Sequence, residues 1–284
     1  MKILVTGGKG QLASSIKDIS KQFDTYSFFF PSSKELDITN KNQVIEFFKE
    51  RNIEFCVNCA AYTAVDKAEE EVQKTIQVNE IGAKNLAEVC KKHDTTLIHI
   101  STDFVFDGRK QSPYLEDDVT NPLGVYGKTK LNGEKHISTI LKKHVIIRTS
   151  WLYSQYGNNF LKTMLRLAST RDEISVVNDQ IGTPTYAGDL AEIVMLFVTR
   201  DIIKYGIYHY SNEGIASWYD FAKTIFDESN IKTLIKPILT IDYPTPAKRP
   251  SYSVLNSSKI SEELDIKIPH WKTSLKKAVI SLSS

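Results

Sequence analysis

The chain is poor in cysteine and has no long hydrophobic run. Only three of its 284 residues are cysteine, too few for a disulfide framework, so we expect a reducing, cytoplasmic environment. No stretch approaches about 18 uninterrupted apolar residues, and the sequence therefore predicts no membrane span and no membrane partner. The first residues enter a strand pattern directly, without a basic segment followed by an apolar one, so we also expect no signal peptide.

Neither sign of charge is in excess. The chain has 36 Lys and Arg against 34 Asp and Glu, a net charge of +2, which gives no reason to expect nucleic acid as a partner. Hydrophobic residues make up 41% of the chain and charged residues 25%, the composition of an ordinary globular protein. A chain of this length accommodates one large domain, or a core domain with a smaller lobe.

The first half of the chain alternates apolar runs with segments of helical periodicity. The runs that predict strands are residues 3–5, 26–30, 55–58, 96–100 and 145–148. The segments that predict helices are residues 11–21, 42–51, an interrupted stretch over 66–92, and 126–141. Because apolar strands alternate with helices, we predict an α/β fold with a Rossmann-type, doubly wound parallel sheet covered on both faces.

The second half is less regular. It predicts helices over 159–168, 186–198, 218–227 and 274–282, strands over 174–177 and 206–210, and loops over 179–184 and 243–250. We expect the strand at 206–210 to rejoin the main sheet. The expected division is a nucleotide-binding domain of residues 1–150 plus about 185–212, and a smaller, partly interleaved α/β substrate lobe of about 151–184 and 213–284.

A glycine-rich turn, Thr6-Gly-Gly-Lys-Gly-Gln-Leu-Ala13, joins the first strand to the first helix. Gly7 and Gly10 let the backbone approach a pyrophosphate, and the new helix offers it free N–H groups and a positive dipole end. Ala13 is small enough for helix and strand to pack closely. The alternative is a tight turn without a ligand. The wide Gly-x-x-Gly spacing resembles that of the short-chain dehydrogenases.

The end of the second strand bears on which nicotinamide cofactor is used. A carboxylate for the ribose 2′-hydroxyl is expected about 20 residues past the glycines, but the chain there reads Phe30-Pro-Ser-Ser-Lys34 and its first acid is Glu35. This leaves room for a 2′-phosphate held by Ser32, Ser33 or Lys34. The sequence therefore predicts NADPH or NADH and leaves the choice open.

Tyr126 and Lys130 are the central candidate catalytic pair. At i and i+4 they share one face of a helix. A tyrosine donates a proton to a carbonyl oxygen that receives a hydride, and a nearby ammonium is expected to lower the tyrosine pKa. Ser101 and Thr102 follow the predicted strand over 96–100 and therefore lie at its C-terminal end, at the sheet edge where such folds bind ligands. A hydroxyl there orients the substrate oxygen. The alternative is an ordinary helix face with a packed tyrosine.

Other polar residues carry weaker signals. Asp103 either hydrogen-bonds the substrate or caps a loop. Asn79, in Asn-x-x-Gly, either supports active-site backbone or lies on a helix surface. His99, within a strand, is expected to be a hydrogen-bonded core residue. Cys56-x-x-Cys59 has no second pair, so we expect core packing rather than a zinc site.

Several motifs together resemble the dTDP-4-dehydrorhamnose reductases, members of the extended short-chain dehydrogenase/reductase superfamily. They span nearly the whole chain in the expected order: Gly7-Gly-Lys-Gly-Gln-Leu12, Leu36-Asp-Ile-Thr39, Asn58-Cys-Ala-Ala-Tyr-Thr-Ala-Val-Asp66, Ser101-Thr-Asp-Phe-Val-Phe-Asp-Gly108, Tyr126-Gly-Lys-Thr-Lys130, Arg148-Thr-Ser-Trp-Leu-Tyr153, Gly157-Asn-Asn-Phe160, Asp179-Gln-Ile-Gly-Thr-Pro-Thr185, Ser217-Trp-Tyr-Asp-Phe-Ala222 and Arg249-Pro250. The resemblance implies reduction of the C4 ketone of a dTDP-linked deoxysugar.

The resemblance also implies residue roles. Tyr126 is the proton donor, Lys130 tunes it and binds the nicotinamide ribose, and Thr102 polarises the substrate C4 oxygen with Asp103 nearby. The implied cofactor contacts are Gly10, Gln11 and Leu12 at the pyrophosphate, Asp37 and Ile38 at the adenine, and Ala60, Ala61, Tyr62 and Thr63 along the channel. The implied substrate contacts are Trp151 at the sugar, and Asn159, Gln180 and Arg249 at the nucleotide diphosphate. For Arg249 the alternative is a surface charge.

Some positions depart from the family pattern: Ala13 replaces the commoner glycine, Phe104 replaces tyrosine and Ser154 replaces glycine. Some members bind magnesium through an acidic cluster at a dimer interface. That cluster has no residue-by-residue match here, so we predict no metal. A homodimer is compatible with the resemblance. The alternatives are a related nucleotide-sugar reductase or epimerase, and a non-catalytic subunit like the regulatory subunit of methionine adenosyltransferase.

Overall fold

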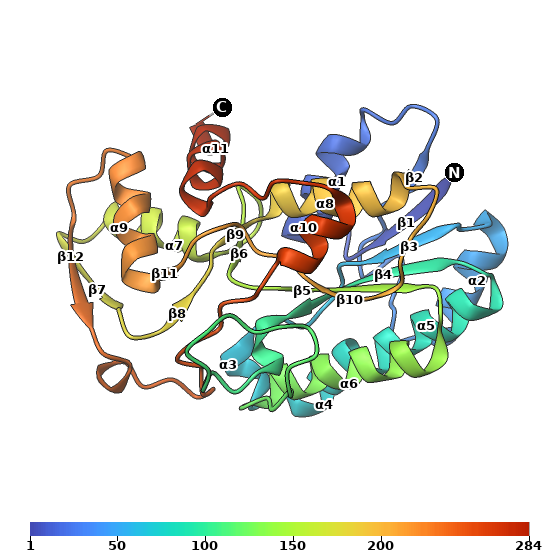
Figure 1. The fold of residues 1–284 in the computed structure, drawn as a ribbon, viewed down its shortest axis with the longest axis horizontal. Coiled ribbons are helices and arrows are strands. Elements are labelled where there is room, and N and C mark those ends of the chain that lie inside the picture. The colour runs from blue at the N-terminus through green and yellow to red at the C-terminus, as the bar shows by residue number, and fades with distance from the viewer. Residues whose placement is uncertain (284) are drawn as a thin grey trace.

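The apolar runs of the first half pair into one parallel sheet (Figure 1). The computed structural model describes residues 1–283 of the chain. The strands of this sheet are β1 (Lys2–Thr6), β2 (Ser27–Phe29), β3 (Phe55–Asn58), β4 (Thr96–Thr102), β5 (His144–Thr149) and β10 (Gly206–His209). Their order is β10-β5-β4-β3-β1-β2, and every pairing is parallel. The predicted doubly wound sheet is confirmed, and β10 rejoins it beside β5.

The strand order creates a crevice at the carboxyl edge of the sheet. The chain leaves β1 toward β2 on one side and returns to β3 on the other side of β1. The connections after β1 and β3 therefore diverge between these two strands. In open α/β sheets, ligands bind at such a switch point. From the fold alone we therefore expect a ligand-binding site at the segments that follow β1 and β3.

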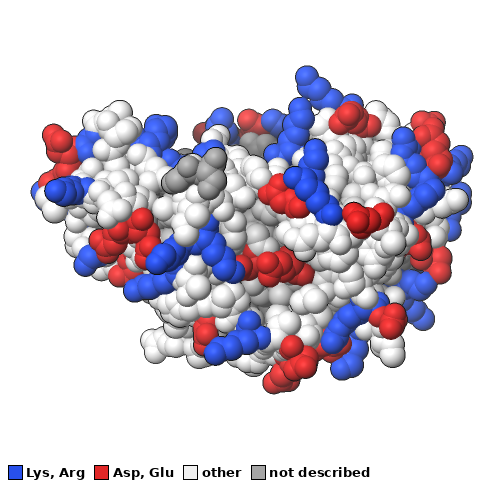
Figure 2. All heavy atoms as spheres, turned by 90° about the horizontal axis from the view of Figure 1, so that it is seen from above, with Lys and Arg blue, Asp and Glu red and all other residues white. Residues whose placement is uncertain are grey.

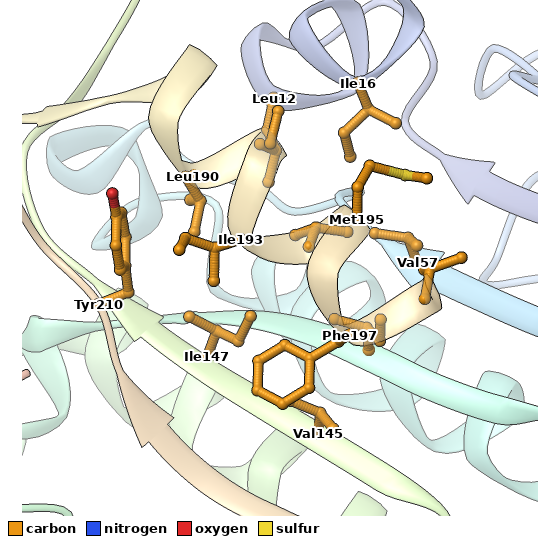
Figure 3. Packing of buried hydrophobic residues seen from close by; sticks show 14 of the residues in the cluster. Leu12, Ile16, Val57, Val145, Ile147, Leu190, Ile193, Met195, Phe197 and Tyr210 are labelled. Carbon is orange, nitrogen blue, oxygen red and sulfur yellow. The ribbon is translucent and has the colours of Figure 1, made fainter. Parts of the chain in front are cut away.

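Helices cover both faces of the sheet (Figure 1). Those on one face are α1 (Gln11–Ser20), α8 (Ala187–Thr199) and α10 (Ser258–Leu264), and those on the other are α2 (Lys41–Arg51), α5 (Gly82–Lys92) and α6 (Val125–Ile140). Figure 3 shows buried side chains of α1 and α8 against the strands: Leu12, Ile16, Leu190, Ile193, Met195 and Phe197 from the helices, and Val57, Val145 and Ile147 from the sheet. This packing holds the first helix, and the turn before it, rigidly on the sheet.

The interrupted stretch between β3 and α5 consists of three short pieces. They are α3 (Val65–Ala68), α4 (Val72–Ile76) and a π-helical turn (Gln77–Ile81), which runs directly into α5. The sequence indicates the interruption but not the π-helical turn, which packs against α6. π-Helical turns are rare and frequently occur at functional sites.

A second group of elements lies at the left in Figure 1. It contains α7 (Phe160–Ala168), α9 (Trp218–Glu228), α11 (Trp271–Ser283), and the parallel pair β7 (Glu173–Val177) and β12 (Leu234–Ile238). Shorter pairs are β6 (Leu152–Tyr153) with β9 (Thr185–Tyr186), and β8 (Ile181–Gly182) with β11 (Ala216–Ser217). Two 3-10 turns cover Asp103–Val105 and Thr240–Asp242. An aromatic-rich core holds this group together.

The second half differs from the sequence expectation in several elements. β8 lies inside the segment expected to be a loop over 179–184, and β12 and α10 were not expected. β8 and its partner β11 have two residues each, too few to show a period in the sequence. β12 alternates poorly because most of its residues stay at least partly exposed. The helix expected over 274–282 begins earlier, at Trp271.

The surface matches the balanced composition. Figure 2 shows positive and negative side chains interspersed over one face of the molecule. Among residues 1–283, no helix has both the length and the apolar character needed to cross a bilayer.

A buried ion pair ties helix α6 to the sheet. Arg148 of β5 donates from Nη2 to Oε2 of Glu134 over 2.7 Å and from Nε to Oε1 over 3.0 Å. The two side chains are only 3% and 2% exposed. Ser101 of β4 also donates to Glu134, and Arg148 donates to the carbonyl of Glu116 over 3.2 Å. Each charge is therefore satisfied in the interior, as burial of an ion requires.

Removal of one partner should destabilise the fold strongly. We expect Arg148→Met to lower the free energy of unfolding by about 3 kcal/mol or more, because Glu134 keeps a buried charge without its main partner. Lys236→Met is the matched control, since Lys236 and Glu173 form an ion pair with 56% and 43% exposed side chains, and such pairs contribute about 1 kcal/mol or less. Urea unfolding curves measure both. Equal losses in the two variants would contradict the structural role of the buried pair.

Candidate active site

The glycine-rich turn after β1 is closed by its own backbone. Gly7 has φ +66°, a left-handed conformation that disfavours side chains, and its carbonyl accepts from the amide of Gly10 over 2.7 Å. Gly8 also needs to lack a side chain, because a Cβ there would lie 2.3 Å from the carbonyl oxygen of Phe30. The sequence reasoning identified Gly7 and Gly10 but missed Gly8, whose constraint comes from the neighbouring strand β2.

Helix α1 begins with an open N-terminus. Its N-cap residue Gly10 provides no side-chain hydrogen bond, and no acidic residue lies in the first turn. The first N–H groups of a helix have no partner within the helix, and together with the helix dipole they favour an anion. This end of α1 is therefore suited to a pyrophosphate.

A pocket of about 490 Å³ lies beside this turn, at the switch point of the sheet. It is lined by residues that follow β1, β2 and β3: Gly7, Lys9, Gly10, Ser32, Ser33, Lys34, Leu36, Asp37, Ile38, Thr39, Cys59, Ala60, Ala61, Tyr62 and Val78. Seven of the expected cofactor positions are thus brought together. Gln11, Leu12 and Thr63 do not line the pocket; Leu12 is 4% exposed in the core and Thr63 faces solvent.

The segment after β2 brings cations and hydroxyls to the pocket. Lys9, Ser32, Ser33 and Lys34 all line it. Glu35 accepts from both the amide and the hydroxyl of Ser32 over 2.7 Å, and these bonds lower the pKa of Glu35 below its usual range. The first acid after β2, Glu35, therefore bonds Ser32 rather than being offered to a ribose hydroxyl.

Two asparagines hold the walls of this pocket. Asn79, in the π-helical turn, accepts from the amide of Tyr62 over 2.8 Å and donates to its carbonyl over 3.1 Å. Asn85 donates to the carbonyls of Ile38 and Thr39 over 3.0 and 3.1 Å. Asn79 is 1% exposed, so the choice between backbone support and a helix surface is settled in favour of backbone support.

Thr102 ends β4 and Tyr126 lies in the first turn of α6, where the Thr102 hydroxyl interacts with the Tyr126 phenol, and Lys130 follows one turn later on the same helix. Thr102 caps the 3-10 turn through its hydroxyl, which accepts from the amide of Phe104 over 3.2 Å. The rings of Phe104 and Tyr126 meet edge to face with centroids 5.6 Å apart. Gly127 permits this close approach, because a Cβ there would lie 2.2 Å from the carbonyl oxygen of Phe104.

The electrostatics of the pair differ from the simple sequence expectation. Burial raises the pKa of Tyr126 to about 12, the nearby Thr102 hydroxyl opposes this shift, and the Asp103 charge adds to it. Burial lowers the pKa of Lys130 to about 8, against the opposing effects of Glu134 and Cys59. The expected lowering of the tyrosine pKa by Lys130 is absent in this geometry, because the lysine Nζ donates to the carbonyl of Ile100 over 2.6 Å instead.

Asp103 is a buried carboxyl beside the trio. It is 2% exposed, and burial raises its pKa to about 6, while the hydroxyls of Ser253 and Thr102 oppose the shift. Its Oδ1 accepts from Thr102 over 3.0 Å, whereas Oδ2 has no hydrogen-bond partner within residues 1–283. A buried polar atom without a partner is costly. The Oδ2 atom of Asp103 therefore retains unused acceptor capacity in the interior.

A second pocket, of about 570 Å³, lies in the group of elements after β5. Aromatic and basic residues line it together with β7: Phe160, Thr163, Met164, Leu167, Arg171, Glu173, Ile174, Ser175, Val176, Val177, Gln180, Trp218, Tyr243, Thr245 and Arg249. Two of the expected substrate positions, Gln180 and Arg249, are among them. The sequence reasoning did not single out Trp218, although its motif contained it.

Trp151 and Asn159 lie next to this pocket without lining it. Trp151 has φ +47° and stacks on Trp218 with centroids 3.6 Å apart and planes 9° apart. Asn159 caps α7, accepting from the amide of Lys162 over 3.1 Å, and donates to Oε1 of Gln11 over 2.9 Å. Asn159 therefore links α7 to the phosphate-binding turn, which leaves little capacity for a ligand.

Arg249 joins the two parts of the molecule. Its Nη2 and Nη1 bond the two oxygens of Asp66 over 2.7 and 3.1 Å, and this pairing lowers the pKa of the Asp66 carboxyl. The fork of Arg249 is thus engaged with a carboxylate in a geometry that also fits a phosphate. Gln180 is engaged as well, since it donates to the Thr240 hydroxyl over 3.1 Å.

Metal ligands do not gather in the part of the chain that the structure describes. No group of three or more His, Cys, Asp or Glu side chains is close enough to hold an ion there.

A family model, curated relatives and solved structures all match nearly the whole chain. Residues 1–284 match the family model described as RmlD substrate binding domain. The chain is 44% identical to the dTDP-4-dehydrorhamnose reductase of Aggregatibacter actinomycetemcomitans, over 97% of each protein. It resembles the crystal structure of a dTDP-4-dehydrorhamnose reductase from Clostridium acetobutylicum, with a TM-score of 0.96, 43% identity and 100% of both chains covered.

A further solved structure adds a bound cofactor. The dTDP-4-dehydrorhamnose reductase of Bacillus anthracis, in complex with NADP, has a TM-score of 0.95 and 38% identity over 99% of each chain. Identities of this size over full-length chains agree with the motifs quoted from the sequence. The chain therefore belongs to the family of the dTDP-4-dehydrorhamnose reductases, which are oxidoreductases.

Proposed function

We propose that this protein reduces the C4 ketone of dTDP-4-dehydro-6-deoxy-L-mannose to dTDP-L-rhamnose with NADPH or NADH. The observation that carries the proposal is the position of Thr102 at the carboxyl end of β4 and of Tyr126 and Lys130 near the start of α6, which packs against this part of β4. The pocket at the switch point suits a dinucleotide, and the second pocket suits a nucleotide diphosphate. Family membership supports the same reaction.

Tyr126 acts in this proposal as the proton donor. Because its pKa is raised to about 12, the phenol is protonated throughout the physiological range and holds a proton for the substrate oxygen. The Thr102 hydroxyl, which donates to Oδ1 of Asp103 in this structure, orients that oxygen by turning from Asp103 and donating to the oxygen instead. These groups place the carbonyl oxygen beside the acid, which is what proton transfer in the transition state requires.

The dinucleotide fits the residues of the first pocket. The open N-terminus of α1 and the turn at Gly7 and Gly10 hold the pyrophosphate, Asp37 and Ile38 flank the adenine, and Lys130 binds the nicotinamide ribose. When bound, the cofactor supplies the hydride. The Lys130 ammonium stabilises negative charge that develops as Tyr126 gives up its proton.

The second pocket holds the nucleotide end of the substrate. Trp218 and Phe160 offer flat apolar surfaces for a base and a sugar, and Gln180 and Arg249 offer donors to the diphosphate. Arg249 leaves Asp66 or shares it when an anion arrives. Trp151 supports this surface from behind by stacking on Trp218. The division into a nucleotide-binding domain and a substrate lobe, as expected from the sequence, is part of this proposal.

Replacement of the acid tests the assignment directly. We expect Tyr126→Phe to lower kcat for NADPH oxidation with dTDP-4-dehydro-6-deoxy-L-mannose by about 100-fold or more, while NADPH binding changes little. Tyr205→Phe is the matched control, since Tyr205 is 42% exposed and far from the trio in sequence. A Tyr126→Phe enzyme that keeps most of its activity would exclude Tyr126 as the acid.

The activity should fall at alkaline pH. Lys130 is an ammonium ion below its pKa of about 8 and an amine above it. Since the amine neither attracts the phenolate nor donates as strongly to the ribose, we expect kcat/KM to decrease as pH rises through about 8. The measurement is kcat/KM from pH 6 to pH 10. A profile that stays flat up to pH 10 would argue against an essential ammonium at this position.

Cofactor preference should depend on the segment after β2. We expect Lys34→Glu to weaken NADPH binding about tenfold, equivalent to about 1.4 kcal/mol, because a carboxylate repels the 2′-phosphate, while NADH binding is nearly unchanged. Lys21→Glu, at the far end of α1, makes the same charge change away from the pocket. Dissociation constants from cofactor fluorescence measure both. Equal losses for NADH and NADPH would refute a 2′-phosphate site here.

A further inference from the structure

His99 occupies the centre of a buried hydrogen-bond chain that ends at Lys130. It lies on β4 and is 1% exposed. Its Nδ1 is 2.9 Å from Nδ2 of Asn58 on β3, and its Nε2 is 3.3 Å from Nζ of Lys130 on α6. The proposed function gives His99 no role, yet both ring nitrogens face polar side chains that are themselves almost completely buried.

The orientation of Asn58 decides which ring nitrogen of His99 carries a proton. Oδ1 of Asn58 accepts from the Thr6 hydroxyl over 2.6 Å and from the Ala60 amide over 3.2 Å. Its amide nitrogen therefore faces His99 and donates to Nδ1. Burial and the Lys130 charge lower the pKa of His99 well below its usual range, so the ring is neutral. A neutral imidazole whose Nδ1 accepts has its proton on Nε2.

This tautomer matters for Lys130. An N–H on Nε2 is accommodated by an amine, which has a lone pair, but not by an ammonium, which has only donors. Nζ of Lys130 also donates to the Ile100 carbonyl over 2.6 Å. The other titratable groups that act on Lys130 are Glu134 on its own helix and Cys59 after β3. The negative charge of Glu134 favours the ammonium, whereas burial raises the pKa of the Cys59 thiol and keeps it uncharged near neutral pH. The imidazole therefore opposes the effect of Glu134.

Building on the proposed role of Lys130, we propose that His99 is a positioning residue that holds Nζ of Lys130 and, through its tautomer, sets the balance between the amine and ammonium forms. Thr6 and Ala60 fix that tautomer by orienting Asn58. Thr6 directly precedes the phosphate-binding turn, and Ala60 lines the dinucleotide pocket. This chain of hydrogen bonds thus connects the backbone that is proposed to bind the cofactor to Nζ of Lys130, the group proposed to assist the proton donor.

The first test determines the tautomer of His99 by a measurement that does not depend on enzyme turnover. Nitrogen-15 NMR of the ¹⁵N-histidine-labelled protein at neutral pH distinguishes an accepting ring nitrogen from a protonated one, and His99→Gln identifies the signals. We expect Nδ1 of His99 to be unprotonated and Nε2 to carry the proton. Asn58→Asp should reverse this, because a carboxylate only accepts and draws the proton to Nδ1. A wild-type His99 protonated at Nδ1, or doubly protonated, would overturn the proposal.

The second test measures how the tautomer of His99 affects the protonation of Lys130. In Asn58→Asp the bare Nε2 accepts from the ammonium, so the alkaline decline in NADPH affinity and in kcat/KM should move up by about one pH unit or more. His99→Gln should move the alkaline decline in the same direction, since the glutamine amide oxygen can accept a hydrogen bond from the ammonium. If Asn58→Asp does not fold, His99→Gln still provides the measurement. Thr96→Val, at the other end of β4, is the control and should leave the decline unmoved.

The two tests separate the two proposals. Declines at the same pH in wild type and both variants would refute the role of His99, since a merely structural residue changes stability without moving a pH profile. The expected NMR signals and shifted NADPH affinity, in a protein that does not turn over the dTDP-sugar, would support the role of His99 and refute the substrate assignment instead.

Discussion

The packing of helix α6 against the ends of β4 and β5 is the constraint on which the rest of the candidate active site depends. A helix that carries a tyrosine and a lysine one turn apart is common, but here the lysine is buried to 2% exposure. That burial is tolerable because the Glu134–Arg148 pair, Ser101 and the Ile100 carbonyl provide polar partners along the same seam. On its other sides, Gly127 lets α6 approach the backbone of Phe104, and Gly133 lets it approach the π-helical turn at Asn79.

Low dielectric surroundings have opposite effects on the two members of the pair. Removal from water disfavours the charged form of each group, which raises the tyrosine pKa and lowers that of the lysine. The phenol therefore keeps its proton, and the pKa of the lysine comes within reach of physiological pH. Neither effect is encoded in the spacing of Tyr126 and Lys130, since both depend on what surrounds them.

The second pocket depends on contacts between segments far apart in the sequence. Asp66 follows β3 while Arg249 follows β12, and their bidentate pairing joins the two parts of the molecule. Gln11 at the start of α1 likewise meets Ser154 and Asn159. The glycine-rich turn and the elements that line the second pocket are thus held in fixed relative positions by a few polar contacts.

The sequence by itself determined the parallel sheet, the glycine-rich turn after β1 and the family, because each rests on a local period or a short motif. Only the tertiary structure decided the rest. Gly8 is constrained by strand β2, Trp151 lies behind Trp218 instead of lining the pocket, and Asn159 caps α7. Strands of two residues and the π-helical turn have too few residues to show a period. The role proposed for His99 emerges only in three dimensions, since Asn58, which fixes its tautomer, is 41 residues away in the chain and Lys130, on which it acts, is 31 residues away.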